Sequence, residues 1–300
     1  MPSWQSYVVN LLLRQFVRRK LTKISTPAQA RAAFSTPRLA KVDGVTFTVG
    51  REGNIPGEWA QNDQTSWNIL LYLHGGGYMA CSPAGYRPIT GAFARHGLAV
   101  FAPDYRLAPE HPFPAAVEDA LAAYQALLTT HAPEQIIVAG DSAGGGLALG
   151  MLLAAREAGM AFPAGLILFS PWTDLAGTGA SITRNAQRDS LLVADRLPEV
   201  AALYLNGAAP ETPTASPLYG DLTNLPPVLI QVSDQEILLD DAVRLAEKIK
   251  SAQGSVTLQI WQGLPHVWQF GQSFLPEARQ ALQQAADFAN RTLASHSPTA

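Results

Sequence analysis

The sequence predicts an α/β fold in which helices flank a mostly parallel central sheet. Short apolar runs rich in Val, Ile and Leu have the length of buried strands, and they alternate with helical patterns. Such alternation is typical of a parallel sheet that is covered on both faces. The chain has 300 residues, of which 47% are hydrophobic and 15% charged, so a large core is expected and a disordered chain is excluded.

Residues 1–38 are predicted to be helix and loop. Tyr7, Val8, Leu11, Leu12, Val17 and Leu21 have the spacing of a helix with one apolar side. This favours packing on the body of the protein over a helix on a membrane surface. The apolar stretch is too short to span a bilayer, and its basic residues follow it, whereas a secretory signal begins with them. We therefore expect no stable membrane insertion. A cytoplasmic location is expected, since Cys81 is the only cysteine and can form no intrachain disulfide.

The remaining elements are expected to follow in a regular order. Predicted strands occupy residues 45–50, 68–74, 98–105, 135–141, 165–171, 227–233 and 256–262, and predicted helices occupy about 113–130, 143–158, 240–252 and 276–294. Residues 175–220 interrupt the rhythm with Gly, Pro, Thr and one helical stretch at 194–205. We interpret 175–220 as an insertion that joins residues 1–38 to form a mainly helical cap, while residues 39–300 form the main domain.

Residues 73–78, "LHGGGY", end the predicted strand at 68–74. Three successive glycines let backbone N–H groups point into a cavity without side chains in the way, and acyl transfer needs such donors for its tetrahedral oxyanion. We assign Gly76 and Gly77 as donors, and give Gly75 the role of shaping the turn. The alternative interpretation is a flexible loop after a strand.

Residues 140–145, "GDSAGG", stand between the strand at 135–141 and the helix at 143–158. This is a G-x-S-x-G nucleophile elbow in the strand-turn-helix context that it requires. Ser142 is the predicted nucleophile, and the helix N-terminus at Ala143 favours a developing anion and supplies a third oxyanion donor. The alternative is a glycine-rich helix start with an incidental serine. A phosphate cradle is disfavoured because no lysine follows the glycines.

His266 lies in "QGLPHVW", directly after the last predicted strand. Catalytic residues gather at the carboxyl ends of strands in open α/β sheets, and a base that follows the acid completes the order Ser, acid, His. We therefore predict His266 as the catalytic base. His74 belongs to the glycine motif and is expected to brace it, and His296 lies in a polar tail.

Taken together, these motifs resemble the hormone-sensitive lipase family of α/β-hydrolases, in its microbial carboxylesterase branch. The matching elements are "HGGGY", "DYRLAPEHPFPAA" at 104–116, "GDSAGG", "SPWTDL" at 170–175, "LPPVLIQVSDQEILLDD" at 225–241 and "LPHVW" at 264–268. The resemblance implies the α/β-hydrolase fold, a catalytic domain at 39–300 with a cap, and carboxylester hydrolysis. It also implies that Arg106 and Glu110 are buried near the site in a structural role.

The resemblance also identifies a candidate for the triad acid. The family usually has D-P-L-x-D in this segment, and Glu236 stands here in the place of the first aspartate, thirty residues before His266. Glutamate suits the role because either carboxylate orients the imidazole and stabilises the imidazolium. Asp234, two residues earlier, is the alternative acid. Asp240 and Asp241 are expected to begin the following helix, where acidic residues suit the N-terminal dipole.

The predicted activity is hydrolysis of short-to-medium acyl esters by a serine carboxylesterase. A lactone hydrolase with the same triad is the alternative, and a non-catalytic ligand receptor on the same fold is a more remote one. Candidates for an apolar substrate pocket are Trp4, Tyr7, Leu11, Phe16, Tyr78, Tyr86 and Leu205.

The predicted partner is a small-molecule ester. No metal or organic cofactor is expected, since the histidines show no metal-ligand spacing and one cysteine is too few for a thiolate site. The net charge of −3 gives no reason to expect nucleic acid. The resemblance also raises a homodimer through the edge strand at 256–262.

Overall fold

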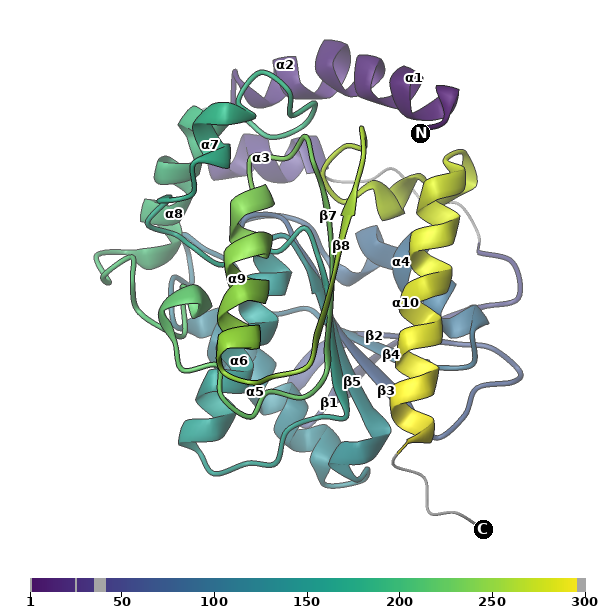
Figure 1. The fold of residues 1–300 in the computed structure, drawn as a ribbon. Coiled ribbons are helices and arrows are strands. Elements are labelled where there is room, and N and C mark those ends of the chain that lie inside the picture. Colours follow the sequence, from purple (N-terminus) through teal and green to yellow (C-terminus); the bar gives the residue numbers. More distant parts are fainter. Residues whose placement is uncertain (1, 25, 35–41, 296–300) are drawn as a thin grey trace.

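An eight-stranded sheet forms the centre of the molecule (Figure 1). The computed structural model describes residues 2–24, 26–34 and 42–295, so the predicted boundary between residues 38 and 39 and the tail residue His296 lie outside the described residues. The strands are β1 (Thr46–Glu52), β2 (Ile55–Gln61), β3 (Ile69–Leu73), β4 (Ala99–Pro103), β5 (Ile136–Asp141), β6 (Gly165–Phe169), β7 (Val228–Ser233) and β8 (Val256–Trp261). Their order is β1-β2-β4-β3-β5-β6-β7-β8, and every pairing from β4 to β8 is parallel. The predicted α/β-hydrolase fold is therefore confirmed.

One strand was absent from the prediction. β2 pairs antiparallel with β1 and β4 although it contains Pro56 and Gly57, which are depleted in strands. Gly57 is required because a Cβ there would lie 2.5 Å from the carbonyl oxygen of Ala102 on β4. The two backbones approach closely at this position, so a glycine is needed there. Because glycine is rare in strands, the sequence did not indicate β2.

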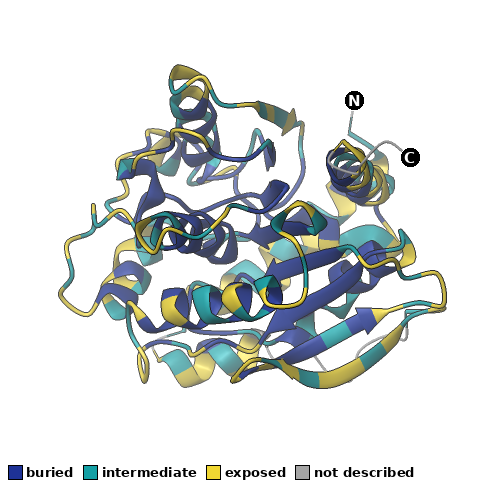
Figure 2. Cartoon of the chain, turned by 90° about the horizontal axis from the view of Figure 1, so that it is seen from below, coloured by how far each residue is buried: buried dark blue, intermediate teal, exposed yellow. Residues whose placement is uncertain are grey.

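Helices cover both faces of the sheet, as Figures 1 and 2 show. α4 (Arg87–Arg95) and α10 (Pro276–Ala294) lie on one face, and α5 (Ala115–Leu128), α6 (Ala143–Glu157) and α9 (Leu239–Ser251) lie on the other. Strand side chains alternate between the two layers: Leu71 and Leu73 of β3 join the α6 cluster, while Leu70 and Tyr72 join the α4 cluster. The four predicted helices differ from α5, α6, α9 and α10 by at most two residues at either end. α4, with Pro88 and Gly91, was not predicted.

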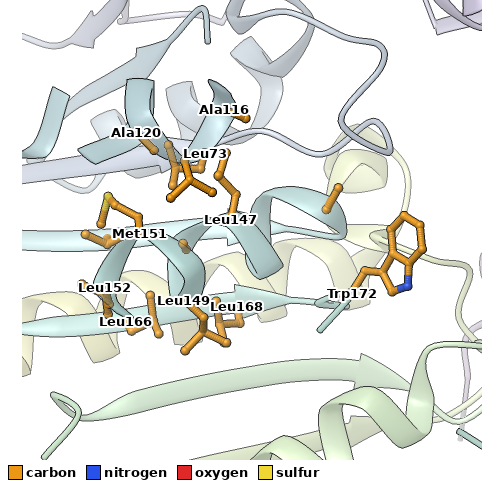
Figure 3. Packing of buried hydrophobic residues seen from close by; sticks show 14 of the residues in the cluster. Leu73, Ala116, Ala120, Leu147, Leu149, Met151, Leu152, Leu166, Leu168 and Trp172 are labelled. Atoms are coloured by element: carbon orange, nitrogen blue, oxygen red, sulfur yellow. The ribbon is translucent and has the colours of Figure 1, made fainter. Parts of the chain in front are cut away.

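Helix α6, which begins directly after Ser142, is buried along most of its length, and Figure 3 shows the hydrophobic cluster around it. Leu147 and Met151 pack in one cluster with Leu73 and Leu168, and each buried side chain of this size contributes about 1.5–3 kcal/mol. At Gly144 a Cβ would lie 2.1 Å from the carbonyl oxygen of Leu73, so the start of α6 sits directly on β3. This packing holds the turn before α6 in a rigid position.

The N-terminal segment and the 175–220 insertion lie together at one end of the sheet (Figure 1). They contain α1 (Trp4–Leu12), the π-helical η1 (Leu13–Arg18), α2 (Arg19–Leu21), α3 (Pro27–Phe34), α7 (Ser181–Arg184), η4 (Ala194–Arg196) and α8 (Leu197–Leu205). Guanidinium groups join the two segments: Arg14 donates to the Arg188 carbonyl at 2.7 Å, and Arg18 donates to the carbonyls of Ala186 and Leu192 at 2.7 and 3.1 Å. Short 3₁₀ turns complete the chain at η2 (Pro83–Tyr86), η3 (Pro133–Gln135), η5 (Pro217–Tyr219) and η6 (Trp268–Ser273).

The expected burial of the N-terminal apolar side is wrong for its first four residues, whereas Val17 and Leu21 are half-buried. Tyr7, Val8, Leu11 and Leu12 are exposed, while Ser6 is the buried residue of α1. Polar contacts contribute to this, because α1 is attached to the body through Ser3, which donates to Glu277, and through Asn10, which donates to the Gly263 carbonyl. Within the described ranges, no helix is both long and apolar enough to cross a membrane.

Candidate active site

Ser142 occupies the turn between β5 and α6 in a strained backbone conformation. Its φ of 52° and ψ of −124° are rare for a residue with a side chain, and such strain persists only where the surroundings impose it. Its N–H donates to the Phe169 carbonyl at 2.9 Å, and its carbonyl accepts from the Trp172 N–H at 2.9 Å. The turn that the GDSAG sequence predicts is therefore present, with Ser142 directly before the first turn of α6.

The glycine loop leaves two backbone donors open beside Ser142. Gly76 and Gly77 have positive φ values of 113° and 62°, which the absence of a side chain permits. Among the described residues, no protein acceptor pairs with the N–H of Gly76, Gly77 or Ala143. The N–H of Gly75 is different, since it donates to the Tyr86 hydroxyl at 2.9 Å and to Asp141 Oδ1 at 3.0 Å.

His266 and Glu236 form a buried pair. His266 Nδ1 lies 2.6 Å from Glu236 Oε2. The other carboxylate oxygen of Glu236 accepts from the Ser233 N–H at 2.7 Å and the Ser170 hydroxyl at 2.8 Å. Burial by itself lowers the pKa of His266, but the charge and hydrogen bond of Glu236 raise it, and the net result is a pKa above the usual value. The carboxylate is held by three donors, so it presents a fixed acceptor to one ring nitrogen.

Asp234 has a different environment. Its Oδ1 accepts from the Gly263 N–H at 2.8 Å, and its Oδ2 lies 3.4 Å from Arg188 on the surface. It therefore braces the loop that leads to His266, with no hydrogen bond between its side chain and the imidazole. Asp240 and Asp241 do lie in the first turn of α9. Both also reach other segments: Asp241 accepts from the N–H groups of Thr173 and Asp174, and Asp240 accepts from Ser181.

A pocket of about 640 Å³ brings these groups together. Ser142, His266, Gly76 and Gly77 lie in its wall. Most of its other lining residues are apolar, and they come from α2, α3 and the insertion as well as from the main domain; they include Leu21, Ile24, Ala30, Met79, Leu192, Val193, Leu197, Val200, Leu203 and Phe270.

The predicted pocket residues divide into three groups. Tyr86 lines the pocket, whereas Tyr78 and Leu205 are buried in the core behind it. Trp4, Tyr7, Leu11 and Phe16 are exposed on the outside and do not line the pocket, so this expectation is wrong. Their positions follow from the outward orientation of α1.

A buried hydrogen-bond network behind the glycine loop was not predicted from the sequence. Asp141 accepts hydrogen bonds from the hydroxyls of Tyr72 and Tyr86, each at 2.9 Å, and from the Gly75 N–H. Burial raises the pKa of Asp141 to about 6, against the effect of these donors. Asp141 thus connects the glycine loop to the turn that holds Ser142. The position of Asp141 next to Ser142 could have indicated a role near the site. No motif in the sequence connects Tyr72 or Tyr86 to Asp141.

His74 has the bracing role that was expected. Its Nδ1 lies 2.8 Å from the Gly75 carbonyl, and its ring stacks on Tyr105 with centroids 4.3 Å apart. Burial lowers the pKa of His74 to about 4, so the ring is neutral at ordinary pH.

Residues of the 175–220 segment also hold the loop that contains Asp234 and Glu236. The side-chain amide of Asn185 donates to the carbonyls of Asp234 and Glu236 at 3.1 and 2.8 Å, and Asp189 Oδ2 accepts from the Ile237 N–H at 3.0 Å. Ser170 connects Glu236 to the segment of His266, because its hydroxyl donates to Glu236 and accepts from the Val267 N–H at 3.3 Å. No spacing in the sequence indicated these contacts.

Arg106 and Glu110 are not buried, which corrects the expectation drawn from the resemblance. Arg106 pairs with Asp119 and Glu118 of α5, and its side chain is partly exposed. Glu110 lies on the surface and pairs with Arg31 of α3 at 2.9 Å. Arg31 also donates to the Met79 carbonyl at 2.9 Å, so this ion pair attaches α3 to the main domain.

Comparison with known proteins gives concordant matches. Residues 70–270 match the family model described as alpha/beta hydrolase fold. An acetyl-hydrolase of Streptomyces hygroscopicus is 44% identical over 262 residues, which cover 87% of this chain and 86% of that protein. An esterase of Acinetobacter venetianus is 35% identical over 298 residues, 95% of this chain and 96% of that one.

Solved structures agree with these matches. A crystal structure of an esterase from the bacterial hormone-sensitive lipase family has a TM-score of 0.91 and 39% identity, and the match covers 98% of this chain and 99% of that chain. A structure of the esterase EstE5 has a TM-score of 0.94 and 36% identity, with 97% and 99% covered.

Proposed function

Because this chain belongs to the bacterial hormone-sensitive lipase family of α/β-hydrolases and is a carboxylic-ester hydrolase, we propose that it works through an acyl-enzyme formed on Ser142. The observation that carries the proposal is the buried 2.6 Å contact between His266 and Glu236 in a pocket that Ser142 also lines. Nucleophile, base and orienting acid are the three groups that acyl transfer of this kind requires.

In the proposed reaction, Ser142 attacks the ester carbonyl while His266 accepts the hydroxyl proton through Nε2. Glu236 holds the imidazole by Nδ1 and stabilises the imidazolium that forms. The N–H groups of Gly76, Gly77 and Ala143 stabilise the oxyanion, and their lack of protein acceptors in the described residues supports this role. His266 then protonates the leaving alcohol, and water hydrolyses the acyl-enzyme by the same steps.

We propose that the N-terminal segment and the 175–220 insertion act as a cap that limits substrate size. Both contribute apolar side chains to the pocket, and Arg14, Arg18 and Arg196 connect them. A pocket of about 640 Å³ suits a short or medium acyl chain together with a small alcohol.

The acyl preference is tested with p-nitrophenyl esters from acetate to palmitate. We expect kcat/KM to peak at short or medium chains and to fall steeply beyond about eight carbons, because a longer chain exceeds a pocket of this size. A peak at long chains contradicts a closed cap. No hydrolysis at any length contradicts the general esterase proposal and favours lactones as substrates.

Lactone hydrolysis remains an alternative within ester hydrolysis, whereas the esterase relatives disfavour the non-catalytic receptor. A lactone hydrolase would use the same triad on a cyclic ester, and it predicts a higher kcat/KM for lactones than for open esters. A non-catalytic receptor predicts no labelling of Ser142 by a fluorophosphonate. The strained backbone of Ser142 and the buried contact between His266 and Glu236 favour a catalytic function over a receptor function.

The pH profile gives a further prediction. Only neutral His266 accepts a proton, so kcat/KM should fall as the pH drops through the raised pKa of His266. In Glu236→Gln, the negative charge that raises the pKa of His266 is lost, while the burial that lowers this pKa remains. The fall of the residual kcat/KM at acid pH should therefore occur at a lower pH than in the wild type. Asp234→Asn is the control, and its kcat/KM should fall at the same acid pH as that of the wild type. A fall at the wild-type pH in Glu236→Gln contradicts the pairing.

Cytoplasmic location and homodimer formation also remain proposals. Cys81 is free, which fits a reducing compartment. β8 pairs only with β7 among the described strands, and its Ile260 is exposed, so its free edge is available to a second copy.

A further inference from the structure

Helix α1 turns its apolar side toward solvent. Trp4, Tyr7, Val8, Leu11 and Leu12 recur with the spacing by which a surface helix usually buries one stripe against the core. Here Trp4, Tyr7 and Leu11 are 66%, 67% and 57% exposed, and Phe16 continues the exposed side at 63%. We call the six residues Trp4, Tyr7, Val8, Leu11, Leu12 and Phe16 the N-terminal apolar face. In Figure 1, α1 forms an outer edge of the molecule.

Specific polar contacts hold the helix in this orientation. Asn10 Nδ2 donates to the Gly263 carbonyl at 2.9 Å, two residues from the strand end that leads to His266. Ser3 donates from its N–H and its hydroxyl to Glu277 of α10 at 2.6 and 2.9 Å. The side of α1 that packs on the body therefore carries Asn10 and the half-buried Val9, which contacts the cluster of Leu264 and Trp268. The larger apolar residues on the opposite side have no partner among the described residues that would bury them.

The apolar surface continues toward the substrate pocket. The Trp4 ring packs edge-on against Phe274 with centroids 5.7 Å apart, and Phe274 is itself exposed. Phe270, in the same 3₁₀ turn before Phe274, is exposed and also lines the pocket. At the other end of the segment, Leu21 and Ile24 line the same pocket.

Positive charge accompanies this face. Arg14, Arg18, Arg19, Lys20 and Lys23 follow α1, and the first acidic residue of the sequence is Asp43, although the whole chain has a net charge of −3. Arg14 and Arg18 donate to carbonyls of the 175–220 segment, while Arg19, Lys20 and Lys23 are exposed. A helix with an apolar aromatic side and basic residues is the type that lies in the surface plane of an anionic membrane.

We propose that the N-terminal apolar face binds an anionic lipid surface, with α1 lying in the plane of the headgroups and Arg19, Lys20 and Lys23 near the phosphates. The helix does not span the bilayer. A second copy of the chain is less suitable as the occupant, because a two-fold contact through this face would bring the same positive charges together. Binding here would place the pocket close to amphiphilic esters in the membrane.

The test is flotation of the full chain with vesicles made of equal parts phosphatidylcholine and phosphatidylglycerol, and with vesicles of phosphatidylcholine alone. We expect the wild type to float with the anionic vesicles, and 0.5 M salt to reduce binding by screening. Leu11→Ser/Phe16→Ser should bind at least about tenfold more weakly, because two large apolar side chains no longer enter the interface. Far-UV circular dichroism and thermal melting show that each variant is folded, without reference to esterase activity.

Matched controls distinguish binding through this face from nonspecific binding of the protein to vesicles. Trp4→Ser should weaken binding, whereas Trp67→Ser, at a tryptophan that is 82% exposed elsewhere, should not. Arg19→Gln/Lys20→Gln should remove the preference for anionic vesicles, whereas Lys250→Gln/Arg291→Gln should preserve it. Absence of flotation, or equal loss in the variants and their controls, overturns the proposal. If sedimentation velocity instead shows a dimer that only the Leu11→Ser/Phe16→Ser variant dissociates, the face belongs to a second copy and the proposal is wrong.

Discussion

Replacing Ser142 with alanine is expected to lower kcat for p-nitrophenyl butyrate by roughly 10⁵- to 10⁶-fold, the loss that removal of a triad serine causes elsewhere. No other hydroxyl stands at the strained turn between β5 and α6. The measurement is initial-rate kinetics together with stoichiometric labelling by a fluorophosphonate. The wild type should bind one label per chain, and Ser142→Ala should bind none.

A buried serine outside the pocket provides the matched control for this experiment. Ser190 is buried in the insertion, and its hydroxyl has no hydrogen-bond partner among the described residues. Ser190→Ala should therefore retain both labelling and turnover. Covalent label on Ser142→Ala, or near wild-type turnover by it, would assign the nucleophile to another residue.

Replacing Glu236 with glutamine is expected to lower kcat by roughly two to four orders of magnitude. The neutral amide no longer stabilises the imidazolium, and it can present an N–H to a ring nitrogen that itself needs an acceptor. Glutamine has the shape of glutamate and can keep the contacts to Ser170 and Ser233. The substitution therefore tests the charge of the side chain more than its packing.

Asp234→Asn is the paired variant, because Asp234 lies in the same loop and braces Gly263 from outside the site. Its kcat should stay within about tenfold of wild type, since an asparagine oxygen still accepts the Gly263 N–H. Glu236→Asp gives a second comparison: the shorter carboxylate keeps the charge and should recover part of the lost rate. An inactive Asp234→Asn beside an active Glu236→Gln would exchange the two assignments.

Local sequence patterns were sufficient for the main elements of the fold. Strands with several β-branched or leucine residues and helices of more than ten residues have clear periods, so seven strands and four long helices were predicted with small errors at their ends. β2 and α4 were missed because Pro56, Gly57, Pro88 and Gly91 contradict local propensity. Their conformations depend on neighbouring strands and helices, and tertiary packing overrides propensity in such places.

The candidate site likewise contains residues that local motifs predicted and contacts that depend on the tertiary structure. Ser142, Gly76, Gly77, Ala143 and His266 stand in short motifs at the ends of strands, and a parallel sheet brings such ends to one edge. The sequence by itself therefore determined the fold class and the class of carboxylic-ester hydrolase, and it supplied the candidates for the site. It left Glu236 and Asp234 as rivals, because both lie in one loop and spacing does not say which way a side chain points.

Only the tertiary structure decided which groups touch. Glu236 meets His266, the hydroxyl of Ser170 and the backbone of Ser233 across segments up to 66 residues apart in sequence. The outward side of α1 was decided in the same way, since periodicity shows that a helix has an apolar stripe but not where that stripe faces. Ser3 and Asn10 fixed its direction through polar contacts with Glu277 and Gly263, and such long-range contacts leave no periodic trace in the sequence.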